Sequence, residues 1–312
     1  MLKRIINQIN KHAIRAENSF LVMIATAIDF ARFKFKVSSN GHTFPGDFDQ
    51  QEILKTLKKE GICVIENYWT KDMCKAATVE IDRLLLEKPE FIHPASQADM
   101  RIFGAENFST DIMEFTADKK LTDIASVYNC EPTIAAFTLA AKLPVIDGNR
   151  GSGDGWHRDA LLRQFKSIIY LSDVDEEGGP FQFIKNSHKL WWILKDIFIG
   201  KLKYRQYRLD DHQVREILSR SHGRIQTYVA KAGTLILVDT SSIHRGKPIV
   251  AGVRYALTNY FYPKRLIDQE LFEKFAPIAG VIDVQRNFLA DNQFLRRFYE
   301  KSNHDRPQPG NS

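Results

Sequence analysis

The sequence predicts an α+β protein with a mainly β core, a double-sheet antiparallel barrel of the jelly-roll type, flanked by helices. From Thr133 onward, short runs of β-branched and aromatic residues recur between Gly, Pro and Asp turns. Several short strands joined by long loops are typical of two packed antiparallel sheets. Hydrophobic residues make up 44% and charged residues 26% of the 312 residues, which is an ordinary globular balance.

Helices and one strand are expected before this region. Residues 49–59 have helical periodicity that stops at Gly61, and residues 62–65 form a short apolar run of the strand type. Thr70 is a suitable N-cap for a helix that extends to Leu86. A further helix is expected over residues 121–128.

The barrel strands follow, and one helical segment interrupts them. The expected strands cover residues 133–143, 167–171, 181–184, 234–238 and 255–262. Residues 190–222 have helical, charged sequence of the kind found in a lid or substrate loop. We therefore expect a single domain over residues 48–301, and a disordered polar tail over residues 302–312.

The N-terminal segment, residues 1–47, is basic and amphipathic. Residues 1–36 contain seven basic and two acidic residues, so they carry +5 of the net charge of +6. This segment could lie on an anionic membrane surface, or it could pack on its own domain or on a partner subunit. The rest of the chain is close to neutral, which argues against a nucleic-acid-binding surface.

The remaining bulk features favour a reducing, cytoplasmic location, with membrane contact limited to the periphery. Cys63, Cys74 and Cys130 are too few and too scattered for a zinc site or a disulfide framework. The apolar run over residues 20–28 is much shorter than the ~20 residues that cross a bilayer. We expect neither a membrane span nor a signal peptide.

The stretch Gly155-Trp156-His157-Arg158-Asp159 carries the chemistry. His157 and Asp159 are two residues apart, so in an extended segment both side chains point to one face. A second imidazole, His244, follows about 85 residues later, beside the expected strand 234–238. Two histidines and one carboxylate form the facial triad that binds Fe(II) and leaves positions open for an oxidant and a co-substrate.

Arg254 and Thr258 strengthen this interpretation. On a strand, period-two alternation places both on one face, with Ala256 between them. A guanidinium pairs bidentately with a carboxylate, and a dicarboxylate co-substrate that chelates iron at one end needs such an anchor at its other end. Lys142, Lys166 and Tyr170 are further candidates for the lining of the pocket.

These motifs resemble the phytanoyl-CoA dioxygenase family of iron and 2-oxoglutarate oxygenases, over about residues 49–263. The resemblance is carried by residues 57–68, by Gly155 to Asp159, by Glu177-Gly178-Gly179-Pro180-Phe181 with Asn186-Ser187-His188-Lys189, and by His244-Arg245-Gly246 with Arg254 downstream. It implies a double-stranded β-helix of the cupin type.

The resemblance also implies roles for individual residues. His157, Asp159 and His244 would be the iron ligands, and Arg254 would anchor the distal carboxylate of 2-oxoglutarate, with Thr258 adding a hydroxyl. Relatives that halogenate have a small residue in place of the carboxylate, so Asp159 favours hydroxylation or another oxidation. The substrates would be dioxygen and a small molecule, a lipid or a sugar.

Two departures and two alternatives remain open. Gly246 stands where family members often carry Ser, and Lys185-Asn186-Ser187-His188 replaces the usual Pro-Gly-Ser-His, with Ser187 and His188 read as turn residues. The alternative functions are a jelly-roll binding protein without turnover, and a cupin-like metal enzyme that does not use 2-oxoglutarate.

The Gly148–Gly155 cluster leads into a strand and lacks a Lys-Ser/Thr ending, so it predicts an active-site loop rather than a phosphate loop.

Overall fold

The computed structural model describes residues 50–92, 99–161, 163–198, 206–220 and 223–264, together with the single residues 28, 31 and 202. The expected basic segment over residues 1–47 falls almost entirely outside the described residues, and the tail over residues 302–312 does so completely. The single-domain boundaries of 48 and 301 lie outside them as well. No helix among the described residues is long and apolar enough to cross a bilayer.

The three helices and the strand predicted before residue 133 are present, and the structure adds α5 and two short 3-10 turns that were not predicted. The structure has α3 (Gln50–Glu60), β1 (Ile62–Ile65), α4 (Lys71–Glu87), α5 (Thr110–Thr116) and α6 (Lys119–Asn129), with short 3-10 turns at Pro89–Phe91 and Ala105–Asn107. The Thr70 hydroxyl caps α4 by accepting a hydrogen bond from the Met73 amide at 3.3 Å. The predicted N-cap is therefore confirmed.

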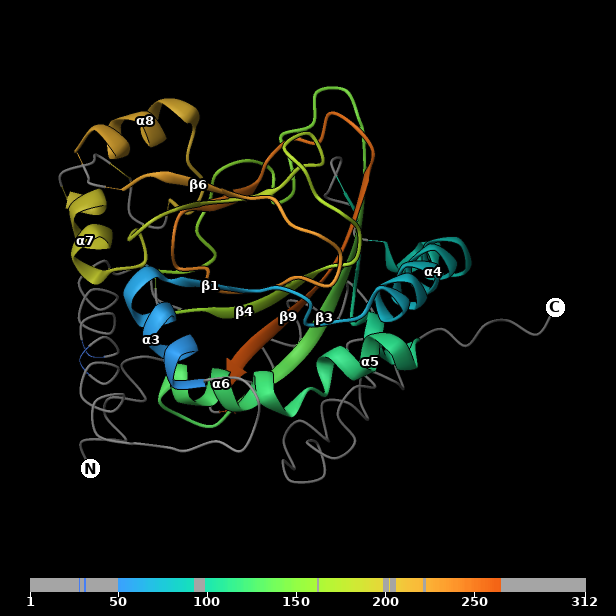
Figure 1. Ribbon diagram of the computed structural model, residues 1–312. Coiled ribbons are helices and arrows are strands. Elements are labelled where there is room, and N and C mark those ends of the chain that lie inside the picture. Colours follow the sequence, from blue (N-terminus) through green and yellow to red (C-terminus); the bar gives the residue numbers. More distant parts are fainter. Residues whose placement is uncertain are drawn as a thin grey trace, which may run out of the picture.

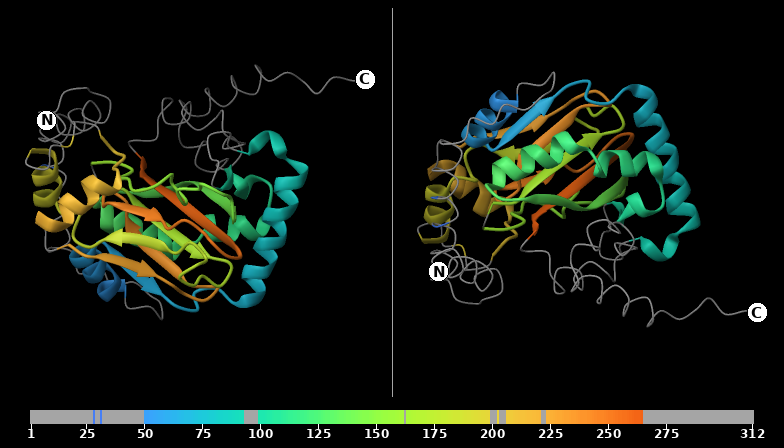
Figure 2. Two further views of the ribbon diagram at one scale, coloured as in Figure 1. Left: turned by 90° about the horizontal axis from the view of Figure 1, so that it is seen from above. Right: turned by 90° about the horizontal axis from the view of Figure 1, so that it is seen from below.

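The larger sheet has six strands in the order β1-β7-β4-β9-β3-β2, and each strand runs antiparallel to its neighbours. Its further members are β2 (Met100–Phe103), β3 (Thr133–Pro144), β4 (Phe165–Tyr170), β7 (Leu235–Asp239) and β9 (Val253–Pro263). Helices α3 to α6 cover its outer face, which is seen from below in Figure 2.

The smaller sheet faces the inner side of the larger one (Figure 1). It consists of β5 (Phe181–Ile184), β6 (Ile225–Tyr228) and β8 (His244–Gly246) in the order β6-β5-β8. Helices α7 (Leu190–Phe198) and α8 (Asp211–Arg220) lie at one end of the molecule, so the expected helical character of residues 190–222 is confirmed where it is described.

Alternation along β4 separates two cores. Phe165 and Ile169 pack in the cluster beneath the helices, whereas Tyr170 packs with Phe181 and Phe183 of the smaller sheet. Lys166 shares the face of Tyr170 and pairs in register with Val238 and Tyr260. Charged and hydroxyl-bearing side chains of this face therefore point into the space between the two sheets.

Three strands were not predicted from the sequence. They are β2, β6 and β8, each of three or four residues and each containing Arg or Gln. The correction matters most for His244. It does not lie beside the strand 234–238 but on β8, because the turn after Asp239 carries the chain from the larger to the smaller sheet.

Glu106 is a buried carboxyl group on the helix side of the larger sheet. Its Oε2 accepts a hydrogen bond from the Thr138 amide at 3.0 Å, and burial raises its pKa to about 8. The folded state therefore keeps the proton up to about pH 8, whereas the unfolded state releases it near the ordinary pKa of 4.5. This group makes the protein less stable as pH rises through that interval.

We therefore predict that Glu106→Gln removes this pH dependence. Relative to the variant, the wild-type protein should lose about 2 kcal/mol or more of unfolding free energy between about pH 5 and about pH 8.5. Urea unfolding of both proteins at the two pH values measures the difference. Parallel pH profiles for the two proteins would contradict the buried, protonated Glu106.

Candidate metal centre

The segment around His157 is held directly against β8. The His157 amide donates to the His244 carbonyl at 2.9 Å, and the His244 amide donates back to the His157 carbonyl at 2.9 Å. Two residues further, the Asp159 amide donates to the Thr240 carbonyl at 2.9 Å. The segment is thus extended, and its two-residue spacing turns His157 and Asp159 to one face, as the sequence predicts.

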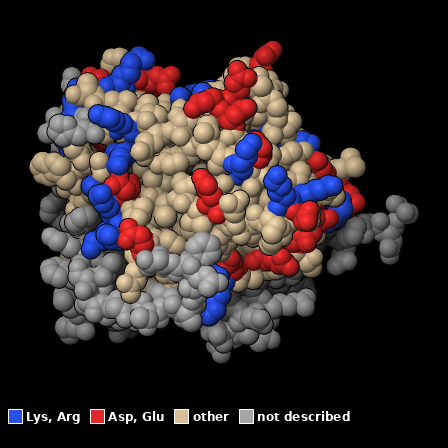
Figure 3. Space-filling model, viewed as in Figure 1, with Lys and Arg blue, Asp and Glu red and all other residues tan. Residues whose placement is uncertain are grey.

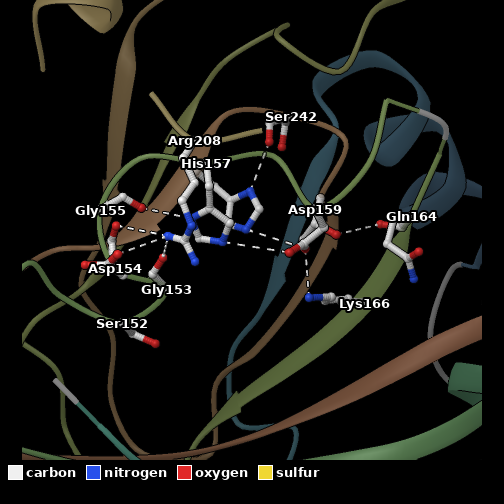
Figure 4. A network of polar contacts seen from close by, with 12 residues as sticks. Ser152, Gly153, Asp154, Gly155, His157, Asp159, Gln164, Lys166, Arg208 and Ser242 are labelled. Atoms are coloured by element: carbon white, nitrogen blue, oxygen red, sulfur yellow. Dashed lines mark hydrogen bonds and ion pairs between the residues drawn. The ribbon is translucent and has the colours of Figure 1, made fainter. Parts of the chain in front are cut away.

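These contacts bring the three predicted side chains together, and Figure 4 labels His157 and Asp159 of this group. One candidate ligand atom from each of His157, Asp159 and His244 lies within 4.8 Å of the others. His157 Nε2 is 3.8 Å from Asp159 Oδ1, and His244 Nε2 is 3.7 Å from Asp159 Oδ2. The ring centroids of the two histidines are 4.3 Å apart.

The backbone fixes which nitrogen of each imidazole faces this centre. His157 Nδ1 lies 2.8 Å from the Gly155 carbonyl, and His244 Nδ1 lies 3.0 Å from the Ser242 carbonyl. A carbonyl oxygen only accepts, so in both rings the hydrogen is on Nδ1 and the Nε2 lone pair is directed at Asp159. Each ring therefore presents an unprotonated Nε2 that could bind a metal ion.

The electrostatics keep the three groups in the protonation states that a metal requires. Burial lowers the pKa of His157, and it lowers the pKa of His244 to about 3, so both rings stay neutral at pH 7. Burial alone would raise the pKa of Asp159, but the charge of Lys166, joined at low pH by that of the two protonated histidines, holds it well below its ordinary value. The site thus offers two neutral imidazoles and one carboxylate.

The Gly148–Gly155 loop, predicted to be an active-site loop, packs against His157. Gly153 has φ +85°, and a Cβ there would lie 2.2 Å from His157 Cε1. Arg208 closes the same side, since its guanidinium donates to the Gly153 carbonyl at 2.7 Å. Only a glycine at position 153 allows the loop to lie this close to the ring.

We predict that Gly153→Ala weakens the binding of a divalent metal by about tenfold or more, because the added methyl group displaces the His157 ring. Gly148→Ala is the matched control, since Gly148 also has a positive φ, of 73°, but a Cβ there meets nothing within 4 Å. It should show only the stability cost of the backbone strain, about 1 kcal/mol. Competition of the protein with a chelating dye measures both affinities, and an equal loss in both variants would contradict the prediction.

Arg254 lies on β9 with its side chain buried. Its Nη1 donates a hydrogen bond to the Gly179 carbonyl, whereas its Nε is buried and has no hydrogen-bond partner among the residues that the structure describes. Burial lowers the pKa of Arg254, and the neighbouring Tyr170 and Asp99 partly offset this decrease. The arrangement leaves a buried cation with an unused donor, which suits an anionic ligand.

Gly246 lies close to the Arg254 side chain. A Cβ at this position would lie 3.2 Å from Arg254 Nη2 and 2.7 Å from the Cβ of Ser152. The glycine therefore makes room for the Arg254 guanidinium. Thr258 shares the inner face of β9, opposite Leu139 and Ile168, and its hydroxyl makes no hydrogen bond with the part of the chain that the structure describes.

The further candidates for the pocket lining fall into three different positions. Lys166 contacts Asp159, with Nζ 2.7 Å from Oδ2. Tyr170 faces inward, but its hydroxyl is used between the sheets, donating to the Tyr228 carbonyl and accepting from the Phe181 amide. Lys142 was predicted wrongly, because it lies on the outer face of β3 and pairs with Asp82 of α4.

Arg158 is a supporting residue that the sequence did not single out. It lies between the two predicted ligands but points the opposite way, where it is 2% exposed and pairs with Asp196 of α7 at 2.5 Å. It also donates to the Ser187 carbonyl at 2.6 Å. The sequence could have indicated this role. Arg158 alternates with His157 and Asp159, so it must lie on the opposite side of the segment, and a buried charge there needs a partner.

Ser187 and His188 are turn residues, as predicted. The Ser187 hydroxyl accepts from the Ile243 amide at 2.8 Å and donates to the Ile184 carbonyl at 2.7 Å. It thereby joins the turn after β5 to the residue before His244. The His188 ring packs against Gly61, where a Cβ would be 2.4 Å from its Nδ1.

Comparison with known proteins identifies the fold. No protein-family model matches the chain, and no curated protein matches it. Solved structures similar to it include EctD from S. alaskensis with 2-oxoglutarate and 5-hydroxyectoine, at 18% identity and a TM-score of 0.56, covering 73% of this chain and 80% of that one. The epimerase SnoN in complex with Fe3+, alpha ketoglutarate and nogalamycin RO has 13% identity and a TM-score of 0.54, covering 69% and 84%.

A third structure, the non-heme alpha ketoglutarate dependent carbocyclase SnoK from nogalamycin biosynthesis, has 13% identity and a TM-score of 0.52, covering 72% of this chain and 88% of that one. At such identities the likeness shows a shared fold. The mixture of helices and antiparallel sheets predicted from the sequence is thereby confirmed.

Proposed function

We propose that the protein is an Fe(II)- and 2-oxoglutarate-dependent oxygenase that hydroxylates a small molecule, lipid or sugar and releases succinate and CO₂. The observation that carries the proposal is the convergence of His157, Asp159 and His244, with ligand atoms within 4.8 Å of one another. Similarity in fold to EctD and SnoN, whose structures contain 2-oxoglutarate (alpha ketoglutarate), supports it.

The donor set fits ferrous iron. Two neutral imidazoles and one carboxylate on one side of a metal leave its other side open for a co-substrate and dioxygen. Both Nε2 lone pairs are already directed at Asp159 by the carbonyls of Gly155 and Ser242. Bound iron would supply the activation of dioxygen, while His157, Asp159 and His244 would fix its position.

The inner face of the larger sheet also holds a side chain that is suited to bind the co-substrate. Arg254 is a buried cation whose Nε has no partner in the described part of the chain, and a guanidinium is suited to the distal carboxylate of a dicarboxylic acid. Thr258 would add its hydroxyl to that carboxylate. Tyr170 and Phe181 bring the two sheets together near Arg254, and a surrounding of this kind excludes water.

The finer features of the proposal rest on the sequence motifs. We assign the chain to the phytanoyl-CoA dioxygenase family and its two facing sheets to the double-stranded β-helix. On the face drawn in Figure 3, basic and acidic side chains of the described residues are interspersed, which suits a small-molecule substrate better than nucleic acid. Contact of residues 1–36 with an anionic membrane stays a prediction, testable by sedimentation with anionic liposomes.

Anaerobic titration with Fe(II) and 2-oxoglutarate tests the proposal. The expected result is binding of both, with a weak visible charge-transfer band that needs the two together. A non-catalytic binding protein would bind neither, and a cupin-like metal enzyme of another type would bind the metal without the band. A screen of candidate substrates for succinate release then addresses the substrate.

A further inference from the structure

Lys166 lies against the carboxylate of the proposed metal centre. It is 5% exposed, and its Nζ is 2.7 Å from Asp159 Oδ2 and 3.7 Å from the centroid of the Tyr260 ring. Figure 4 shows Asp159 between the imidazoles on one side and Lys166 on the other. The ammonium is held by the carboxylate and the aromatic ring, so it is fixed inside the protein.

The contact involves an oxygen that also faces a histidine. Asp159 Oδ2 is the atom 2.7 Å from Lys166 and also the atom 3.7 Å from His244 Nε2. A metal bound by His244 and this oxygen would have to share it with the ammonium. Asp159 is the only anion among the three proposed ligands, so the competing cation acts on the ligand that contributes most to the attraction of a metal.

The net charge of the groups between the two sheets also opposes the binding of a metal alone. With Asp159, Lys166 and Arg254 ionised, these three groups carry one positive charge before anything binds. A divalent metal alone adds two positive charges to this buried region, whereas 2-oxoglutarate brings two negative ones. Buried charges interact strongly, so the metal should be disfavoured and the dianion favoured by the presence of Lys166.

We propose that Lys166 is a built-in counter-ion of Asp159 that competes with the metal, so that the site holds a divalent metal weakly until 2-oxoglutarate binds. The proposal rests on the proposed function and assigns a regulatory role to one side chain of that site. It predicts opposite effects of the Lys166 charge on the two ligands, which neither a purely structural lysine nor one that orients Asp159 for the metal would produce.

The chain contains a matched control on the other face of the same sheet. Lys142 Nζ is 2.7 Å from Asp82 Oδ1 and 5.3 Å from the Tyr255 ring centroid, so it repeats the combination of lysine, aspartate and tyrosine away from the metal centre. Lys142→Met removes a strand lysine and an ion pair of equal length. It should change neither ligand's affinity.

The experiment measures Mn(II) binding by electron paramagnetic resonance without 2-oxoglutarate, and 2-oxoglutarate binding by calorimetry at saturating Mn(II). We expect Lys166→Met to bind Mn(II) about tenfold or more tightly than wild type, and 2-oxoglutarate about tenfold or more weakly. Lys166→Arg keeps the charge and should stay within about threefold of wild type for both. Lys166→Gln is a second neutral variant should the methionine variant not fold.

The possible results of this experiment distinguish the proposed role of Lys166 from its alternatives. Weaker Mn(II) binding in the neutral variants would overturn the proposal and make Lys166 a residue that orients Asp159. Unchanged affinities would make the contact structural. Wild-type protein that binds Mn(II) equally well with and without 2-oxoglutarate would overturn it without any variant. If the wild-type protein bound no divalent metal at all, that result would instead contradict the proposed function itself.

Discussion

Replacing His157 or Asp159 with alanine is expected to abolish succinate formation, both with a substrate and in the uncoupled reaction without one. Each replacement removes one of three protein ligands, and the remaining two hold the metal too weakly and in the wrong geometry. A metal contributes several kcal/mol to catalysis, so the loss should be about 10³-fold or more. Succinate release at saturating Fe(II) and 2-oxoglutarate measures it.

His212→Ala is the control, because it removes an exposed imidazole on α8. It should keep wild-type succinate formation. The anaerobic charge-transfer band should disappear in the His157 and Asp159 variants and persist in the control. Full turnover in either ligand variant would refute the assignment of that side chain to the metal.

Changing Arg254 to lysine is expected to raise the KM for 2-oxoglutarate by about 100-fold, with metal affinity much less affected. Lysine keeps the charge but loses the planar fork, and losing a buried charged hydrogen bond costs about 2–5 kcal/mol. The Gly179 carbonyl also loses its donor, so thermal unfolding of the variant must be measured beside its kinetics.

The steady-state dependence of succinate release on 2-oxoglutarate tests this, together with Mn(II) binding. Arg83→Lys on α4 is the control, since Arg83 pairs with Glu80 and Glu87 on the outer side of the molecule, away from the metal centre. An Arg254→Lys variant that kept its KM for 2-oxoglutarate but lost metal binding would contradict the role of Arg254 in binding the co-substrate.

The sequence predicted the parts of the site that depend on local spacing. His157 and Asp159 share a face because two residues separate them in an extended segment, and Arg254, Ala256 and Thr258 share a face of β9 for the same reason. The strands with continuous β-branched and apolar sequence, such as Leu235–Asp239, were found to within two residues. Each of these inferences needs only the local chain geometry.

The parts that were missed depend on how distant segments pack. The three residues of β8, His-Arg-Gly, have no strand pattern, and they are extended because they pair with β5 and with His157. The contact of Lys166 with Asp159 requires the distance between β4 and the segment after Trp156, which no spacing reveals. Lys142 was misplaced because the face on which it lies depends on the register of β3 with β9.

A crystal structure grown anaerobically with Fe(II) and 2-oxoglutarate tests the central claim most directly. The account predicts one iron in contact with Nε2 of His157, Nε2 of His244 and a carboxylate oxygen of Asp159, with the distal carboxylate of 2-oxoglutarate on the Arg254 guanidinium. Iron bound at another place, or 2-oxoglutarate bound away from Arg254, would contradict it.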